Sequence, residues 1–346
     1  MDGRERYLRA LHFAGPDRVP MMHRAIPGAF SLYGQQLREL YERYPADVLF
    51  SPVAYTWFGF DRVVGEGSGR LRGAVDEWGC VWDSFADGYL GQVVGHPLDD
   101  WAKLEDYRFP DPASGRAGVD ALVDAVRADG HRHYVPVLAG TLWQQTFWLR
   151  GFENALLDVL DDRPEMHYLR DRLVEFLLQR IEIILEHREH VDGIQINDDW
   201  GTQQGLMISP AHWRRIYKPA YARLVAAIHS AGLQAHLHTD GHVAAIVEDL
   251  IEIGFDEINP QVSCMDLADL SRRCRGRVCV RADVDRQYHL PYGTPAEMAA
   301  HVRSLYDAFG GPTGGYVGYG EVSTDVPLAN VEAMLRAIAE LPTRAN

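Results

Sequence analysis

The sequence predicts an α/β fold, a TIM-type (β/α)8 barrel in which parallel strands alternate with helices. Two observations lead to this prediction. Short apolar runs of strand length alternate with longer segments of helical periodicity along the 346 residues, and about eight such repeats are typical of a closed barrel. No Gly-x-Gly-x-x-Gly follows an early strand, which disfavours the alternative, an open doubly wound sheet. We expect a single domain over residues 1–346.

The order of elements follows from hydrophobic periodicity and from turn residues. Strands are predicted at residues 19–22, 46–53, 134–139, 193–197, 235–238, 257–262, 278–282 and 316–320. Helices are predicted at residues 2–13, 30–44, 119–128, 141–159, 162–190, 243–253, 265–274, 295–309 and 327–340, and one more begins at residue 209. In segment 58–100, glycines separate short alternating runs, which predicts a β-hairpin insertion after the second strand.

Composition excludes several classes of protein. Apolar residues make up 47% of the chain and charged residues 24%, as in ordinary globular proteins. The net charge of −15, with one small basic cluster at residues 272–277, argues against nucleic-acid binding. No apolar run is long enough to span a bilayer, and residues 1–6 lack the apolar core of a signal peptide. We therefore expect a cytoplasmic protein without membrane contact, whose four cysteines are reduced thiols.

The stretch at residues 234–242, Gln-Ala-His-Leu-His-Thr-Asp-Gly-His, combines metal-binding residue types at strand spacing. Alternate residues of a strand share a face, so His236, His238 and Asp240 can project the same way at its C-terminal end. Two imidazoles and a carboxylate could bind a metal or move protons. They could equally be polar residues that hydrogen-bond one another without catalysis, and the local motif leaves both interpretations open.

The barrel prediction brings further polar residues to the same end. TIM barrels place their active sites at the C-terminal ends of the strands. Polar residues stand at or just after most of the predicted strand ends: His23, Arg24, Asn197, Asp198, Asp199, His238, Asp240, Asn259, Gln261, Arg281, Asp283, Arg286 and Glu321. Each residue alone could be structural, but their convergence predicts a functional site.

A metal site is predicted from His238, Asp240 and Glu321. One imidazole and two carboxylates leave coordination positions open for a substrate, as catalytic metal sites do. This donor set suits a divalent metal, with zinc expected first and manganese or Fe(II) as alternatives. His236 could be a fourth ligand, but we expect it one layer deeper, because barrel interiors are packed in layers.

The remaining candidates are assigned to catalysis or to substrate binding. Asp198 and Asp199 could add a ligand, hold a substrate hydroxyl or amine, or act as a base beside His238, or they could simply accept backbone N–H groups in a turn. Arginines could pair a substrate carboxylate, although Arg281 could equally pair with the nearby Asp283. Substrate contacts are predicted for His23, Arg24, Asn197, Asn259, Gln261, Arg281, Asp283 and Arg286.

These motifs resemble those of the uroporphyrinogen decarboxylase superfamily, which also contains zinc-dependent methyltransferases that demethylate methylcobamides onto coenzyme M. The similar stretches lie at residues 4–20, 47–51, 198–210, 238–254, 293–297 and 326–330, in order along nearly the whole chain. The resemblance implies a TIM barrel, adds Gln203 to the substrate-binding candidates, and implies a homodimer and a corrinoid protein as partners.

The chain departs from both known activities at specific positions. The decarboxylases carry an arginine-rich early loop, where this chain has the single Arg24, and a Phe-Ser-Asp motif, where this chain has Phe-Ser-Pro at residues 50–52. The methyltransferases bind zinc through His-x-Cys-Gly and a late cysteine. Here Asp240 replaces the first cysteine in His-Thr-Asp-Gly, and Glu321 falls near the second. The resemblance therefore implies an uncharacterised branch that keeps a metal site with harder ligands.

Three functions remain open from the sequence. The first is a metal-dependent enzyme that transfers a methyl or one-carbon group on a small polar substrate. The second is a metal-free decarboxylase or lyase of a small carboxylic acid that uses Asp198, His238 and Arg24. The third is a non-catalytic protein that binds a corrinoid or a small metabolite. We expect the first, with a small-molecule substrate and no nucleic-acid partner.

Overall fold

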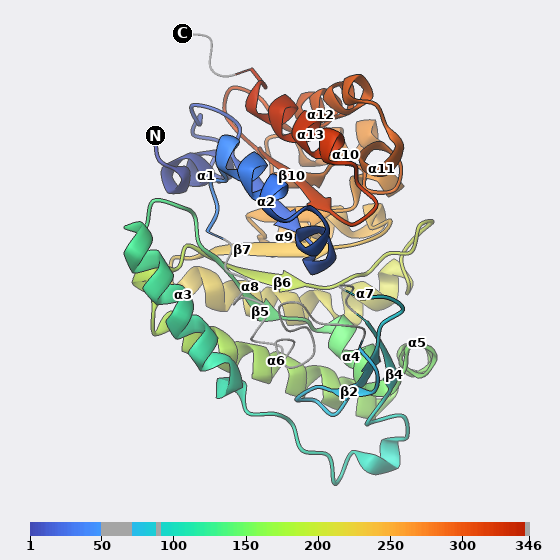
Figure 1. Cartoon of the computed structure of the whole chain (residues 1–346). Coiled ribbons are helices and arrows are strands. Elements are labelled where there is room, and N and C mark those ends of the chain that lie inside the picture. The colour runs from blue at the N-terminus through green and yellow to red at the C-terminus, as the bar shows by residue number, and fades with distance from the viewer. Residues whose placement is uncertain (50–70, 88–90, 343–346) are drawn as a thin grey trace.

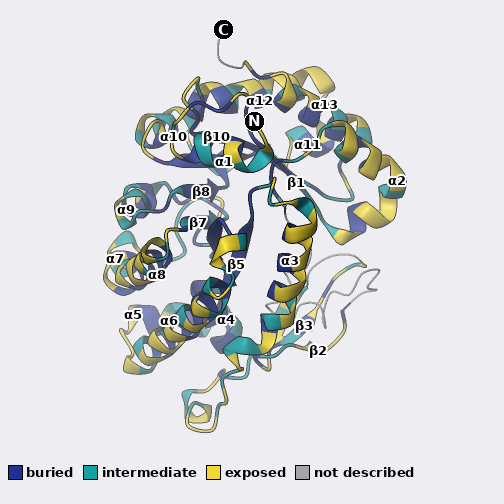
Figure 2. Cartoon of the chain, turned by 90° about the vertical axis from the view of Figure 1, so that its left-hand side faces the viewer, coloured by how far each residue is buried: buried dark blue, intermediate teal, exposed yellow. Residues whose placement is uncertain are grey.

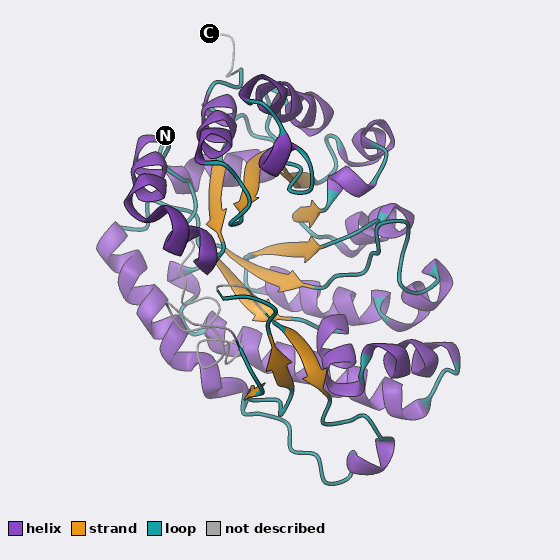
Figure 3. Ribbon diagram, turned by 45° about the vertical axis from the view of Figure 1, so that its right-hand side comes forward, coloured by secondary structure: helices purple, strands orange, loops and turns teal. Residues whose placement is uncertain are grey.

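The centre of the molecule is a curled parallel sheet of seven strands. The computed structural model describes residues 1–49, 71–87 and 91–342. Neighbouring strands follow the order β1-β10-β9-β8-β7-β6-β5, and Figure 3 shows them curving round the centre with helices outside. Because the strands run parallel, their carboxyl ends meet at one end of the sheet, which we call the mouth. The strands are β1 Met21–Ala25, β5 Pro136–Gly140, β6 Gly193–Asn197, β7 Gln234–Thr239, β8 Glu257–Pro260, β9 Cys279–Asp283 and β10 Tyr316–Val322.

Helices cover the outside of this sheet (Figure 1), and Figure 2 shows buried residues on the strands and exposed residues on the outer sides of the helices. In the long helix α6, Leu169, Leu173 and Leu177 recur at helical spacing and are buried. Helix α12 begins at a capping box, in which Thr294 and Glu297 satisfy each other's backbone N–H groups. The helices are α1 Gly3–Leu11, α2 Pro27–Arg43, α3 Arg116–Asp129, α4 Trp143–Arg150, α5 Phe152–Leu160, α6 Pro164–Leu185, α7 Pro210–Ile216, α8 Lys218–Ser230, α9 Val247–Ile253, α10 Leu267–Cys274, α11 His289–Tyr292, α12 Pro295–Phe309 and α13 Leu328–Ala339.

The position between β1 and β5 differs from the prediction. A regular strand was expected over residues 46–53, but the described part of that segment forms a single parallel bridge. Its backbone still reaches both neighbours: Asp47 N donates to Met21 O at 2.8 Å, and Leu49 N donates to Tyr134 O at 2.9 Å. The segment from residue 50 lies outside the described residues. The α/β class and the curled parallel sheet are confirmed, whereas the structure describes seven regular strands in this sheet rather than a closed barrel of eight.

The predicted insertion is confirmed in the part that the structure describes. Strands β2 (Ala74–Val75), β3 (Val81–Asp83) and β4 (Gln92–Gly95) form a separate antiparallel sheet. The carboxylate of Asp76 accepts two backbone N–H groups in the turn between β2 and β3, which fixes that turn. Residues 58–70 of the predicted insertion lie outside the described residues.

One predicted helix, over residues 141–159, is two helices in the structure. Gly151 separates α4 from α5 and has φ 85° and ψ 141°. A residue with a Cβ is strained at such a positive φ, so glycine permits the chain to change direction here. Gly151 therefore marks the break between the two helices.

Two expectations from composition can be compared with the fold. All four cysteines are free thiols, as the absence of a Cys-x-x-Cys pair predicts. Within the described ranges, none of the helices is both long enough and apolar enough to cross a membrane. Both findings agree with the composition.

Candidate metal centre at the mouth of the sheet

Strand register brings the predicted site residues to one level at the mouth. Asn197 of β6 lies opposite His238 of β7, and His238 lies opposite Asn259 of β8. Across the sheet, Arg24 of β1 lies opposite Glu321 of β10. Residues that are far apart in sequence therefore meet, because parallel strands end at the same edge.

Asp199, His238 and Asp240 form a group that could hold a metal ion. One ligand atom from each residue lies within 4.8 Å of the others. His238 Nε2 is 3.7 Å from Asp199 Oδ1 and 3.7 Å from Asp240 Oδ1. An ion could bind between these atoms with small side-chain movements, since zinc bonds to nitrogen and oxygen ligands are about 2.0–2.2 Å long. The group shares His238 and Asp240 with the predicted ligand set, but its third member is Asp199 in place of Glu321.

Asp199 is held in this position by two hydrogen bonds. Gln144 Nε2 donates to Asp199 Oδ2 at 2.7 Å, and Asp240 N donates to Asp199 Oδ1 at 3.0 Å. Burial and the negative charge of Asp240 raise the pKa of Asp199. Gln144 was missed in the sequence, although it lies just after β5, where a strand-end residue is expected to face the mouth.

Two arginines contact the carboxylates of Asp240 and Glu321. Arg286 binds Asp240 through its NH2 atom and lies with NH1 at 3.7 Å from Glu321, which also forms an ion pair with Arg24. Burial alone would raise the pKa of Asp240, but the charges of His238 and Arg286 lower it. Glu321 is thus held by two guanidinium groups and lies outside the group of three ligands.

Backbone contact between two loops brings Asp199 beside His238 and Asp240. Gly201 N donates to Asp240 O at 3.0 Å. A Cβ on Gly241 would lie 2.2 Å from the carbonyl carbon of Gly201, so the two glycines pack backbone to backbone. Gly241 also has φ 80°. The Gly of the His-Thr-Asp-Gly motif is therefore needed both for its φ and for this close approach.

Asn259 and Asp283 form a layer behind His238. His238 Nδ1 lies 2.7 Å from Asn259 Oδ1. Asn259 Nδ2 donates to Arg281 O at 2.6 Å and to Asp283 Oδ1 at 2.7 Å. Burial raises the pKa of Asp283, while the charge of Arg286 opposes the shift. Both Asn259 and Asp283 are buried: Asn259 contacts the imidazole of His238, and Asp283 contacts Asn259.

Asp198 is fully buried, and its carboxylate is used within the fold. It accepts the backbone N–H groups of Leu142 and Gln144, at the start of α4, and the hydroxyl of Tyr221 at 2.6 Å. Burial raises the pKa of Asp198 to about 7, although these hydrogen bonds oppose the shift. Asp198 thereby anchors the helix that presents Gln144 to the metal group, and a role as base stays a prediction.

A charged layer lies below the mouth, inside the sheet. Arg281 NH2 donates to Gln195 Oε1 at 3.0 Å, and Arg281 Nε lies 3.5 Å from Glu257. His236 contacts Glu257 at 3.2 Å and Tyr134 at 2.5 Å. The prediction that His236 lies deeper is confirmed, since its exposure is 1%. Arg281 is 2% exposed, and its acidic partner in this layer is Glu257 rather than the aspartate considered from the sequence.

The other four residues predicted to bind substrate contact different parts of the protein. His23 stacks on an aromatic ring of α2, and burial lowers the pKa of His23 to about 4. Gln261 accepts the backbone N–H of the motif glycine, Gln203 accepts a cysteine thiol, and Asn197 accepts a side-chain amide. Of these contacts, the one between Gln261 and Gly241 N reaches the loop that carries Asp240, and it does so through the backbone.

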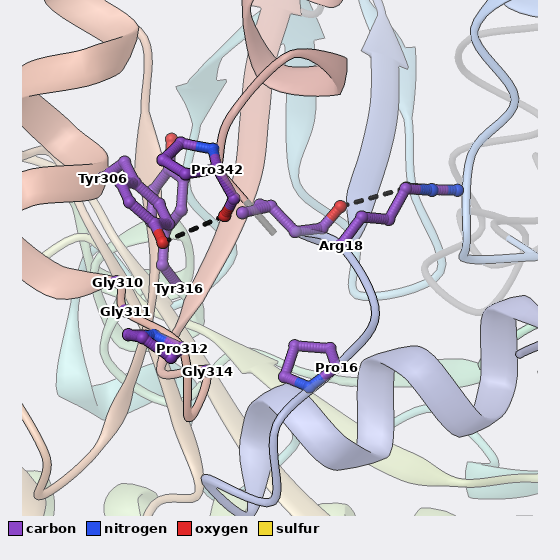
Figure 4. Close-up of a pocket in the computed structure, with 10 residues that line it drawn as sticks. Pro16, Arg18, Tyr306, Gly310, Gly311, Pro312, Gly314, Tyr316 and Pro342 are labelled. Atoms are coloured by element: carbon purple, nitrogen blue, oxygen red, sulfur yellow. Dashed lines mark hydrogen bonds between the residues drawn. The ribbon is translucent and has the colours of Figure 1, made fainter. Parts of the chain in front are cut away.

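A small hollow drawn in Figure 4 lies away from the mouth. Tyr316, the first residue of β10, and Arg18, which precedes β1, line it, so it opens at the amino ends of the strands. Its volume of about 10 Å³ is room for about one water molecule. A hydrogen bond of 3.2 Å from the Tyr306 hydroxyl to Pro342 O closes one side. The hollow is unrelated to the metal group.

Comparison with solved structures gives an extensive likeness. The chain is similar to a methyltransferase from Methanosarcina mazei, with a TM-score of 0.68 and 16% identity over 98% of this chain and 99% of that chain. A dihydropteroate synthase from Xanthomonas albilineans has a TM-score of 0.33 and 18% identity over 49% of this chain and 62% of that one. The first likeness shows a shared fold, and the second is too weak to support an argument.

Sequence comparison assigns the family. No curated protein matches the sequence. The family model described as uroporphyrinogen decarboxylase (URO-D) matches residues 83–341, which is well over half of the chain. The match spans the insertion from β3 onward, the strands β5 to β10 and the metal group. The chain therefore belongs to the uroporphyrinogen decarboxylase family.

Proposed function

We propose that this protein is an enzyme that depends on a divalent metal and transfers a methyl or another one-carbon group on a small polar substrate. The observation that carries the proposal is the placement of His238 Nε2 at 3.7 Å from both Asp199 and Asp240. The family match and the methyltransferase fold support the reaction class. Transfer from a corrinoid protein and a homodimeric assembly belong to the same proposal.

The donor set and the charges fit a divalent cation. An imidazole nitrogen with two carboxylates suits zinc, manganese or Fe(II), and lacks the thiolates that favour soft metals. Among the described residues at the mouth, four carboxyl groups face two guanidinium groups: Asp199, Asp240, Asp283 and Glu321 against Arg24 and Arg286. A cation bound between Asp199 and Asp240 would offset the repulsion between these two carboxylates.

Each side chain then has a role. The bound metal would act as a Lewis acid on a substrate heteroatom. Asp199 and Asp240 would hold it with His238, while Arg286 orients Asp240. Arg24, at the edge of the site, would contact an anionic part of the substrate.

Metal content tests the proposal. Protein purified without chelator should contain about one divalent ion per chain, and Asp240→Ala should contain far less, because one of the three ligands is lost. Methylcobalamin serves as a probe of the reaction, and its demethylation in the presence of a small acceptor should stop with EDTA. Absence of stoichiometric metal from the wild-type protein would contradict the proposal.

A second candidate function has one observation in its favour. Arg286 contacts Asp240 directly, and Arg24 contacts Glu321, so arginines can neutralise two of the carboxylates without a metal. A metal-free decarboxylase or lyase could use such arginines to bind a carboxylic acid. Turnover of a carboxylic substrate that survives EDTA would select this function. Tight retention of a corrinoid or metabolite without turnover would instead indicate a binding protein.

A further inference from the structure

We propose that Asn259 is a positioning residue, which fixes the tautomer of His238 so that Nε2 presents a lone pair to Asp199 and Asp240. Asn259 is 1% exposed and touches His238 on the side away from the two carboxylates. The hydrogen-bond geometry stands by itself, but its consequence for metal affinity rests on the proposed metal-dependent function.

The orientation of the Asn259 amide is set by its two other partners. One is the backbone carbonyl oxygen of Arg281 at 2.6 Å, and the other is Asp283 Oδ1 at 2.7 Å. A carbonyl oxygen can only accept, so the amide nitrogen must face it, and Oδ1 must face His238. Since Asn259 Oδ1 is an acceptor at 2.7 Å from Nδ1, a neutral His238 carries its proton on Nδ1.

The tautomer matters because of what lies at the other nitrogen. Nε2 is 3.7 Å from oxygens of both Asp199 and Asp240. Without an acceptor at Nδ1, the imidazole would place its proton on Nε2, where two carboxylates attract it. That proton would occupy the lone pair through which an imidazole binds a metal. Asn259 therefore shifts the competition between proton and metal at Nε2 towards the metal.

The hydrogen bonds at position 259 require an asparagine, and side chains of similar shape, aspartate and leucine, cannot form all of them. An aspartate at 259 could accept from His238, but its second oxygen would face Arg281 O and Asp283 Oδ1, two acceptors at less than 3 Å. A leucine has the same branching but is larger and forms no hydrogen bond. Only a side chain with one acceptor and two donors satisfies all three neighbours.

The test measures the tautomer directly. Side-chain ¹⁵N NMR of the full-length protein, after EDTA treatment and at about pH 8, should show His238 with its proton on Nδ1. The signals are assigned by their loss in His238→Gln. In Asn259→Leu the proton should move to Nε2, and the affinity for added Zn²⁺ should fall by about 10–100-fold, as for other residues that orient a metal ligand.

Asn330→Leu is the matched control. Asn330 is also buried and donates its amide to two backbone carbonyls, of Leu290 and Gly293, but does not contact the metal group. Its loss should lower stability without changing the His238 tautomer or the affinity for Zn²⁺. This separates a positioning role of Asn259 from a purely structural one.

The outcomes separate the two proposals. A wild-type protein in which His238 carries its proton on Nε2 would overturn the inference, and this measurement needs no variant. Unchanged tautomer and Zn²⁺ affinity in Asn259→Leu overturn it as well. If the tautomer changes as expected but the wild-type protein binds no divalent metal, the positioning role of Asn259 stands and the proposed metal-dependent function fails.

Discussion

Asp198 and Asp199 are adjacent in the sequence, but their carboxylates have opposite surroundings. Asp198 is 0% exposed and accepts two backbone N–H groups and a tyrosine hydroxyl. Asp199 is partly exposed at the mouth and lies beside the like charge of Asp240. The first carboxylate is therefore satisfied within the fold, whereas the second lies beside a like charge, as we expect for a site proposed to bind a cation.

Replacement of each aspartate should separate these roles. Asp198→Ala leaves buried donors of Leu142, Gln144 and Tyr221 without an acceptor, so the free energy of unfolding should fall by about 2–4 kcal/mol. Asp199→Asn removes the repulsion from Asp240, so it should leave stability unchanged or raise it. Urea unfolding measures both. An equal fall in the free energy of unfolding of the two variants would show that Asp199 is also structural.

At the scale of elements, the loops after β6 and β7 form one unit. Gly201 and Gly241 touch through their backbones, and His242 N donates to Thr202 O at 2.7 Å. The first loop carries Asp199 and the second carries Asp240. The geometry of the metal group therefore depends on how closely the two loops approach each other.

Gly241→Ala should disturb both stability and cation binding. Its Cβ would lie 2.2 Å from the Gly201 backbone, so the loops must separate. Gly276→Ala is the matched control, because Gly276 has a similar φ of 74° with no atom within 4 Å of an added Cβ. The free energy of unfolding of the control should fall by about 1 kcal/mol, because alanine is strained at this positive φ. Its affinity for Zn²⁺ should not change. Calorimetry would contradict this if both variants bound Zn²⁺ equally well.

The loop after β9, which carries Arg286 towards Asp240, is fixed by a pair of histidines. His301 of α12 accepts the backbone N–H of Asp285 at 3.1 Å and stacks on His289, with ring centroids 4.1 Å apart. Burial, with a smaller contribution from the charge of His289, lowers the pKa of His301 to about 4. The folded loop therefore favours a neutral His301.

This shift gives the pH dependence of stability a definite sign. The pKa of His301 in the folded state lies below its unfolded value of about 6.5. The contribution of neutral His301 to the free energy of unfolding is present above about pH 6.5 and is lost as the pH falls towards 4. His301→Gln keeps an acceptor but does not titrate, so its melting temperature should fall less than the wild type's between pH 7.5 and 4.5. The exposed-site variant His12→Gln should behave like the wild type, and identical pH dependence in all three would refute the assignment.

Sequence patterns predicted the elements better than the details of the site. Buried parallel strands appear as continuous apolar runs, so β6 was predicted with its observed bounds, Gly193–Asn197. The break at Gly151 and the irregular segment at Asp47 depend on backbone geometry and tertiary hydrogen bonds, which apolar periodicity does not encode. The sequence offered Asp198 and Asp199 only as possible additional ligands, and the structure brings Asp199 beside His238 and Asp240. Where a strand turns into a loop the alternation of side chains ends, so the sequence could not tell which of Asp198 and Asp199 faces the mouth.

At the scale of the whole molecule, the parallel sheet explains how a site can be assembled from distant segments. His238 and Asn259 lie near the ends of β7 and β8, Asp199 and Arg286 follow β6 and β9, and the four residues meet because those strands end together. The same architecture is shared with a methyltransferase at 16% identity. Such a fold needs apolar strands and a covering layer of helices, which many sequences supply, and leaves the strand ends free to vary in their chemistry.

We propose above that Asp199, His238 and Asp240 bind a divalent cation. Calorimetric titration of Zn²⁺ into the EDTA-treated protein tests it most directly, with Asp199→Asn and Glu321→Gln compared side by side. We predict one site per chain in the wild type, a loss of more than about tenfold in affinity for Asp199→Asn, and nearly unchanged affinity for Glu321→Gln. No binding to the wild-type protein, or a loss in Glu321→Gln but not in Asp199→Asn, would contradict the claim.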